Sequence, residues 1–223
     1  MPVAAVVFDI DGVLIDSESV WAAAREELAR EVGADWGPDT QERMMGMSSR
    51  EWSRFMRDEL GVPMEPDQIS ANVVERLGRR YREHLPLLPH ARKAVRRLAE
   101  HWPLGVASSS NRPLIDLVLE LAGLSGCFRA SVSSEEVPRG KPAPDVYFEA
   151  ARRLGEDPRE CAAIEDSTNG ILAATAAGMR TIAVPRPDYP PRPEALSRAA
   201  AVLDSLADLT PQIVSGSAEA TTA

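Results

Sequence analysis

Two aspartates near the start of the chain are the residues best suited to chemistry. Asp9 and Asp11 follow the apolar run Val6–Phe8, and Gly12 comes directly after them. Alternate residues of a strand point to the same side, so both carboxylates are expected together where a buried strand ends. Neighbouring carboxylates repel each other unless a cation or a shared proton relieves the repulsion. The pattern therefore predicts a site for Mg2+, which prefers oxygen ligands, and Gly12 allows a sharp turn there.

Two further polar clusters are suited to binding an anion. Ser108 ends an apolar run, and its hydroxyl can donate to a phosphate oxygen, with free amides at the start of the next helix adding donors. Ser110 or Asn111 is also expected to cap that helix. Lys141 lies between a glycine and a proline before a helix, where it can neutralise an anion. A single lysine of this kind is more often a solvated surface residue.

A fourth cluster supplies more acids. Glu165 and Asp166 follow an apolar run directly, and such a pair is costly without a counter-ion. A helix cap at Asp166 or Ser167 would explain one polar residue but not the acidic pair. The pair fits the ligands still needed by a Mg2+ site that Asp9 and Asp11 begin.

The elements that must position these residues alternate along most of the chain. The expected strands are Ala4–Phe8, Leu104–Ser108, Ala130–Ser133, Ala162–Ile164 and Thr181–Val184. The expected helices between them are His90–His101, Arg112–Ala122, Pro144–Leu154 and Thr168–Ala177. Strands without polar alternation are typical of a parallel sheet covered on both faces. The expected fold is α/β, a Rossmann-like doubly wound parallel sheet, whose ligands bind at the carboxyl ends of the strands, where all four clusters fall.

One long stretch interrupts this alternation. Between the first two expected strands the pattern is helical, at Ser17–Val32, Ser48–Leu60 and Pro66–His84. A connection of this length is more than a simple crossover, so an inserted helical bundle is expected. The expected division is a core of residues 1–16 and 86–214, a helical cap of residues 17–85 and a disordered tail of residues 215–223. Pro185–Pro193 is expected to form a surface loop at the edge of the sheet.

Composition narrows the class of protein. The chain of 223 residues has a formal net charge of −9 and a pI of about 5.0, which argues against nucleic-acid binding. Cys127 and Cys161 lie in apolar stretches and are expected to be buried free thiols in a reducing compartment. No signal peptide and no apolar stretch long enough to cross a membrane is evident. A soluble, cytoplasmic, monomeric protein is expected.

Together, the four clusters resemble the motifs of the haloacid dehalogenase-like superfamily, in its phosphatase branch with a helical cap after the first strand. The resemblance covers about Val3 to Val184. Asp9-Ile10-Asp11-Gly12-Val13 is similar to the first family motif and Ser108 to the second. Lys141 matches the third motif, and Glu165-Asp166 the fourth.

The resemblance implies a mechanism. Asp9 would be the nucleophile that takes the phosphoryl group as an aspartyl-phosphate. Asp11 would protonate the leaving oxygen and then activate water. The implied Mg2+ ligands are Asp9, the Asp11 backbone carbonyl and Asp166, with Glu165 acting at least through water. The implied phosphoryl-binding groups are Ser108, the Ser109 amide and Lys141.

The helical insert is the expected source of substrate specificity, because such inserts act as lids in this family. The residues expected to do this lie in Asp16-Ser17-Glu18, at Trp21 and in Gly46–Arg50, with Glu18, Trp21 and Arg50 as the candidates. Arg50 could meet a second anion or a sugar hydroxyl, although a solvated helix face is the commoner role of such an arginine. For Trp21 the alternative is the core of the cap.

The expected function is a Mg2+-dependent phosphatase of small phosphorylated metabolites, namely sugar or polyol monophosphates. Asp11 favours phosphate esters, since dehalogenases and phosphonate-cleaving relatives lack an aspartate there. A first alternative is a phosphoryl-transfer isomerase similar to β-phosphoglucomutase. Those mutases place a histidine where this chain has Trp21, which favours the hydrolase. A second alternative, an inactive binding module, is disfavoured because every charged motif residue is present.

Overall fold

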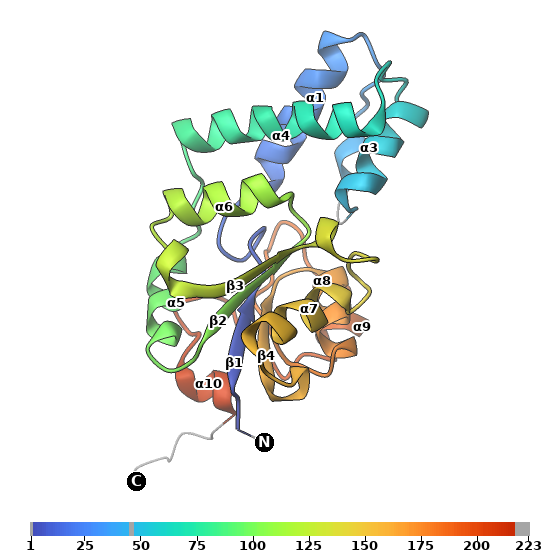
Figure 1. Cartoon of the computed structure of the whole chain (residues 1–223). Helices are drawn as coiled ribbons and strands as arrows, with labels where there is room; N and C mark the ends of the chain where they lie inside the picture. Colours follow the sequence, from blue (N-terminus) through green and yellow to red (C-terminus); the bar gives the residue numbers. More distant parts are fainter. Residues whose placement is uncertain (1, 45–46, 217–223) are drawn as a thin grey trace.

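The computed structural model describes residues 2–44 and 47–216. Its centre is a six-stranded sheet with the strand order β3-β2-β1-β4-β5-β6, and every pairing is parallel (Figure 1). The strands are β1 (Ala5–Phe8), β2 (Leu104–Ser108), β3 (Phe128–Ser133), β4 (Cys161–Glu165), β5 (Arg180–Ala183) and β6 (Ala201–Val202). The chain winds outward in both directions from β1 and β4, so the point where the strand order reverses lies between them. The predicted α/β fold, a doubly wound Rossmann-like parallel sheet, is confirmed.

Helices cover both faces of the sheet because successive side chains of each strand point to opposite sides. Val6 and Phe8 of β1 join the apolar cluster that includes residues of α5 and α6, whereas Ala5 and Val7 join the cluster of α7 and α8. All four residues of β1 are fully buried. The helices that follow the insert are α5 (Ala91–Ala99), α6 (Arg112–Leu121), α7 (Asp145–Leu154), α8 (Thr168–Ala176), α9 (Pro193–Leu196) and α10 (Pro211–Ser215). Short 3-10 turns occupy Ser125–Cys127, Ser134–Glu136 and Pro158–Glu160.

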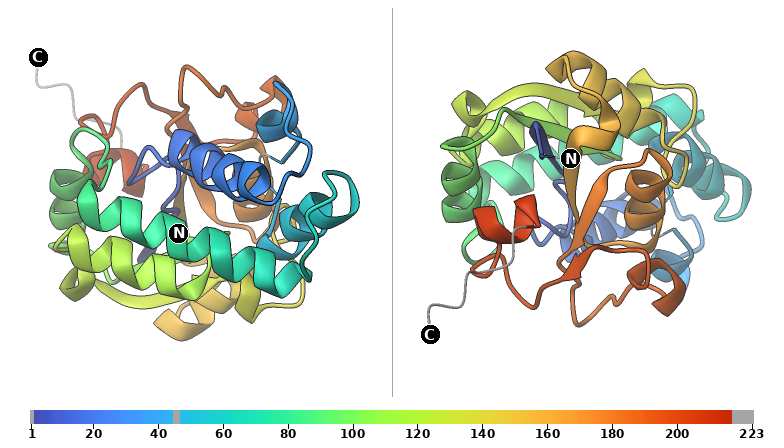
Figure 2. Two further views of the ribbon diagram at one scale, coloured as in Figure 1. Left: turned by 90° about the horizontal axis from the view of Figure 1, so that it is seen from above. Right: turned by 90° about the horizontal axis from the view of Figure 1, so that it is seen from below.

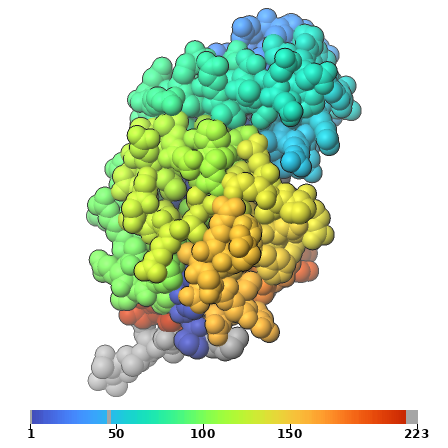
Figure 3. Space-filling model, in the orientation of Figure 1, coloured from blue at the N-terminus to red at the C-terminus, as the bar shows by residue number. Residues whose placement is uncertain are grey.

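The described part of the segment between β1 and α5 holds four helices that lie beyond one end of the sheet (Figure 1). They are α1 (Glu18–Glu31), α2 (Thr40–Met44), α3 (Ser49–Asp58) and α4 (Pro66–Glu83). Helices α1 and α4 pack side by side, and α4 also contacts α3 and α6 (Figure 2). In the space-filling view these helices form an upper layer above the sheet and its covering helices (Figure 3).

The two chain segments that join this layer to the sheet lie next to each other. The Asp16 N–H donates to the Pro86 carbonyl at 2.8 Å, and the Leu88 N–H donates to the Leu14 carbonyl at 2.9 Å. Ile15 and Leu87 form an antiparallel bridge between these two bonds. The chain therefore leaves the sheet region for the helical layer and returns to it at one place.

Several details differ from the sequence analysis. The short elements α2, β6, α9 and α10 were not predicted, since segments of two to five residues carry too little periodicity to detect. The predicted tail begins too early: Ser215 is the last residue of α10, which the Thr210 side chain caps, while residues 217–223 lie outside the described residues. Both cysteines are free, but only Cys161 is buried, and Cys127 is half-buried. No described helix is long and apolar enough to cross a membrane.

Candidate active site

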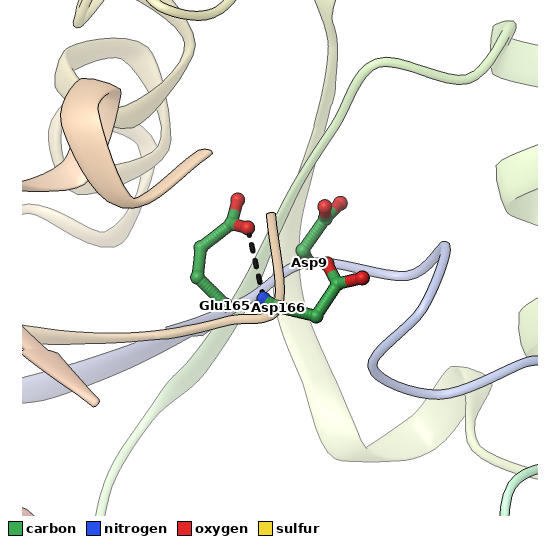
Figure 4. A group of neighbouring side chains, drawn as sticks. All are labelled: Asp9, Glu165 and Asp166. Atoms are coloured by element: carbon green, nitrogen blue, oxygen red, sulfur yellow. Dashed lines mark hydrogen bonds between the residues drawn. The ribbon is translucent and has the colours of Figure 1, made fainter. Parts of the chain in front are cut away.

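Three acids meet where β1 and β4 end. Asp9 follows β1, and Glu165 and Asp166 follow one another at the end of β4, its neighbour in the sheet. One carboxylate oxygen from each lies within 4.8 Å of the others, and the side chains arise from two adjacent strand ends (Figure 4). Parallel pairing of Phe8 with Ile164 sets this register. Three of the four carboxylates that the sequence analysis placed together are therefore close in space, and Asp11 lies outside this group.

Two glycines make room for these carboxylates. A Cβ at Gly12, whose φ is +77°, would lie 1.8 Å from Asp166 Oδ2. A Cβ at Gly170 would lie 1.9 Å from the Glu165 carboxylate oxygens. Any side chain at either position would displace an acid of the site. Gly170 was missed by the sequence analysis, although a glycine in the first turn of a helix is unfavourable enough to be a signal.

Both carboxylate oxygens of Glu165 accept hydrogen bonds from the protein. Its Oε1 accepts from Lys141 Nζ and from the Tyr147 hydroxyl, each at 2.6 Å. Its Oε2 accepts from the Asp166 N–H at 3.1 Å, and from the N–H and hydroxyl of Ser167. The Lys141 ammonium also lies 3.0 Å from Asp9 Oδ2. Glu165 therefore orients Lys141 toward Asp9, and Tyr147 is a further residue of the site that the sequence analysis missed.

The environment of the acids fits a divalent cation. Burial, reinforced by the charges of Glu165 and Asp11, raises the pKa of Asp9 from 3.8 to about 8 even though Lys141 opposes the shift. Burial also raises the pKa of Asp166 well above its ordinary value, with Glu165 and Asp9 adding to the effect. The enclosed Oδ1 of Asp166 has no hydrogen-bond partner among the described residues. A hard cation bound between Asp9 and Asp166 would supply that partner and relieve the repulsion.

Asp11 belongs to a separate polar group beside this cluster. Its Oδ2 accepts from the Ser110 hydroxyl at 2.6 Å, and the Ser108 hydroxyl lies at 3.5 Å from the same oxygen. Its Oδ1 accepts from the indole N–H of Trp21 at 3.2 Å. A residue of α1 thus contacts the second aspartate directly. Ser110, which the sequence analysis considered only as a cap, is a partner of Asp11.

Asn111 links the sheet to the helices above it. It stands at the N-cap position of α6, as predicted, but its side chain makes no cap hydrogen bond. Its Oδ1 instead accepts from the Ser49 hydroxyl of α3 at 3.0 Å, and its Nδ2 donates to Ser70 of α4 at 3.3 Å and to Glu135 at 2.6 Å. Ser167, in contrast, does cap α8 by accepting from the Gly170 N–H.

A cavity of about 910 Å3 opens between the acids and the upper helices. Asp9, Asp11, Ser109 and Asp166 line it from the sheet, while Ser108 and Lys141 are buried beneath its surface. The upper helices contribute Glu18 and Trp21, as predicted, and also Arg25, Gln41 and Trp52, which were not predicted. The sequence pattern of α1 gave no sign that Arg25 is buried, because part of its cover, the Trp52 ring, comes from another helix.

Of the predicted segment Gly46–Arg50, Met47 lines this cavity and Arg50 stays apart from it. Arg50 lies on the exposed side of α3 and does not line the cavity. Gly46 lies outside the described residues. The proline-rich loop Pro185–Pro193 is exposed over most of its length, as predicted, and it also reaches the cavity. Arg186, Tyr189 and Arg192 line the cavity, and Arg186 pairs with Asp16 at 2.9 Å.

Comparisons with known proteins agree with this arrangement. A model of the haloacid dehalogenase-like hydrolase family matches residues 3–178. Hexitol phosphatase B of Escherichia coli K12 is 37% identical over 212 residues, covering 92% of this chain and 94% of that protein. A probable pseudouridine-5'-phosphatase of Drosophila melanogaster is 35% identical over 217 residues, covering 92% and 91%.

Solved structures are similar along nearly the whole chain. CbbY from Rhodobacter sphaeroides in complex with phosphate has a TM-score of 0.85, and a mutant of the same protein in complex with xylulose-(1,5)bisphosphate has a TM-score of 0.84. Both are 26% identical in sequence and cover 95% of this chain and 99% of their own.

Proposed function

The chain belongs to the haloacid dehalogenase-like hydrolases, and on that premise we propose that it is a Mg2+-dependent phosphatase of sugar or polyol monophosphates. The proposal rests mainly on the position of Asp9. Its carboxylate lies 3.0 Å from the Lys141 ammonium and beside the unpartnered oxygen of Asp166, at the carboxyl edge of the sheet. The names of the relatives, a hexitol phosphatase among them, support the substrate class.

In the proposed reaction Asp9 attacks the phosphorus of the ester. The bond between phosphorus and the ester oxygen breaks, and Asp11 gives its proton to the leaving alcohol. An aspartyl-phosphate on Asp9 remains. Water then attacks the phosphorus while Asp11 takes its proton, and the bond from phosphorus to Asp9 breaks to release inorganic phosphate and restore both acids.

Neighbouring groups would hold the transferring phosphoryl oxygens. The Lys141 ammonium, the Ser108 hydroxyl and the Ser109 amide are the donors at that place, and Lys141 is fixed there by Glu165. Mg2+ would be held by Asp9, Asp166 and the Asp11 backbone carbonyl, with Glu165 acting through water, and it would offset negative charge on the phosphoryl group. We assign residues 17–85 to a cap that closes over the substrate and excludes water.

The alternatives are less well supported. At the position where the related mutases place a histidine, this chain has Trp21, whose indole donates to Asp11. An inactive binding module would not need to keep Asp9, Lys141 and Glu165 together in a buried cluster, which is costly to form without a ligand.

The test is phosphate release from a panel of hexitol, hexose, glycolate and nucleotide monophosphates, with Mg2+ or with EDTA. We expect Mg2+-dependent release from the hexitol or hexose phosphates and none from Asp9→Asn. Asp11→Asn should lower the rate by about 10²- to 10⁴-fold. Release that survives in EDTA or in Asp9→Asn would contradict the mechanism, and isomerisation of β-glucose 1-phosphate without release would favour the mutase.

A further inference from the structure

The wall of the cavity opposite the carboxylates contains a buried guanidinium that the proposed reaction does not use. Arg25 of α1 is only 5% exposed. Its Cζ lies 4.7 Å from the centroid of the Trp21 ring and 4.8 Å from that of Trp52. These two indoles also contact each other edge to face, at 5.9 Å between centroids. The guanidinium of Arg25 therefore packs against two aromatic rings, which set its orientation.

Arg25 is the end of a short chain of oriented polar groups. Its Nη1 donates to Gln41 Oε1 at 3.2 Å, and Gln41 Nε2 donates to Glu18 Oε2 at 3.2 Å. The Gln41 amide thus separates the guanidinium from the carboxylate. Among the described residues Arg25 forms no ion pair, and its buried Nε has no hydrogen-bond partner. Burial lowers the pKa of Arg25 only to about 10, so the group stays charged at neutral pH.

This chain of groups lies where a leaving group would extend. Glu18, Trp21 and Arg25 are spaced so that they share one face of α1. The Trp21 indole donates to Asp11, the proposed acid, and Arg25 packs against the same indole. A substrate whose ester oxygen is at Asp11 would therefore run along Trp21 toward Arg25, Gln41 and Glu18.

The charges of the cavity decide what kind of ligand fits there. Away from the reacting acids, Asp16, Glu18, Glu42 and Asp188 line it together with Arg25, Arg186 and Arg192. Arg186 is already paired with Asp16. A second anionic group on the substrate would be repelled by most of this lining. A hydroxyl both donates and accepts, so a row of hydroxyls matches a guanidinium, an amide and a carboxylate in succession.

We propose that Glu18, Gln41 and Arg25 form a subsite for the uncharged, hydroxyl-bearing carbon chain of the substrate, and that this subsite selects polyol and sugar monophosphates over bisphosphates. The proposal rests on the proposed function, since it places the ester at Asp9 and Asp11. It adds Arg25 and Gln41 to the residues that determine specificity.

The test compares two phosphate esters that differ only beyond the reacting end. Sorbitol 6-phosphate carries hydroxyls, and propyl phosphate does not. In Arg25→Met, which keeps the stem of the side chain, kcat/KM for sorbitol 6-phosphate should fall about 10- to 100-fold, while kcat/KM for propyl phosphate should stay within about 2-fold. The matched control is Arg54→Met on the exposed side of α3, which should change neither value.

A second variant tests the same subsite without removing the buried arginine. Gln41 is half-buried at the cavity surface, so Gln41→Leu should fold normally and give the same selective loss with a smaller amplitude. An equal loss for both esters in either variant would mean a purely structural role and would overturn the subsite. So would no loss at all, or a wild-type preference for sorbitol 1,6-bisphosphate that Arg25→Met removes.

Binding separates this proposal from the proposed function. In the Asp9→Asn background, sorbitol 6-phosphate should change the fluorescence of Trp21 and Trp52, and Arg25→Met should weaken its binding by about 10-fold or more. Binding that depends on Arg25 without turnover by the wild type would keep the subsite and reject the phosphatase. Turnover with binding that does not depend on Arg25 would keep the phosphatase and reject the subsite.

Discussion

At the scale of single residues, the ionisation of Asp9 makes the stability of the fold depend on pH. Its pKa is 3.8 ordinarily and about 8 in the fold. A carboxyl whose pKa is raised by folding holds its proton more tightly when folded, so its contribution to stability is greatest below about pH 4 and is lost as the pH rises toward about 8. Binding a cation between Asp9 and Asp166 would offset this loss.

We therefore expect Asp9→Asn to stabilise the metal-free protein at high pH. The asparagine has no charge to bury, so the melting temperature in EDTA should exceed that of the wild type by a few degrees at about pH 8, and by less at about pH 5. Scanning calorimetry across this range measures the difference. A lower melting temperature for the variant at pH 8, or a difference that does not change with pH, would contradict the argument.

Gly12 gives a second prediction at this scale. Alanine at this position would drive a Cβ into the Asp166 carboxylate, so Gly12→Ala should weaken Mg2+ binding by about 10-fold or more. Gly61 is the matched control, because its φ of +75° imposes the same backbone strain while its Cβ would meet nothing within 4 Å. Mg2+ titration monitored by calorimetry compares the two variants. Equal weakening in both would assign the effect to the backbone and not to the carboxylate.

The site residues that lie next to a strand end or a helix start could be predicted from the sequence. Asp9, Asp11, Lys141 and the Glu165-Asp166 pair follow strands or precede helices, so residue type and spacing alone placed them at one sheet edge. Arg25 was not predictable in this way. It begins the charged run Arg25-Glu26-Glu27 on α1, which is typical of a solvated helix, and part of its cover is Trp52 of another helix.

At the scale of secondary-structure elements, Asn111 ties α6 to the helices above the sheet. Removing its side chain in Asn111→Ala would leave Ser49 and Glu135 without their shared partner. Amide hydrogen exchange in the first turn of α3 should then become about 5-fold faster or more, because each lost buried hydrogen bond costs about 1 kcal/mol.

Asn72→Ala is the control for this prediction. Asn72 is a half-buried residue of α4, and its side chain bonds only within that helix. Its replacement should leave exchange in α3 unchanged. If both variants had the same effect, general loosening of the helical layer would explain the result, and Asn111 would not be a specific link.

At this scale, some segments could be predicted from sequence patterns and others could not. The long helices were found because their apolar periodicity extends over several turns, and β1 to β5 because each is a short run rich in apolar or β-branched residues. The loop at Pro185–Pro193 has no periodicity, and its role follows only from the ion pair of Arg186 with Asp16. That contact joins residues 170 positions apart in the chain, and no local pattern reports it.

At the scale of the whole molecule, the strand order places the reaction and the recognition of substrate on different parts of the chain. The acids that would carry the reaction follow β1 and β4, on either side of the point where the order reverses. The residues that would recognise the rest of the substrate lie in α1 and α2. A change of substrate can therefore occur in the helices while the reacting groups stay in place.

The adjacent entry and exit of the insert have a consequence for evolution. Because the Asp16 amide bonds to the Pro86 carbonyl, the ends of residues 17–85 meet at a single point on the rim of the sheet. An exchange of this whole segment between genes would break no pairing between strands and would need no new linker. A protein of this fold could acquire a new substrate by recombination at two sites, while the sheet keeps the same strand pairing.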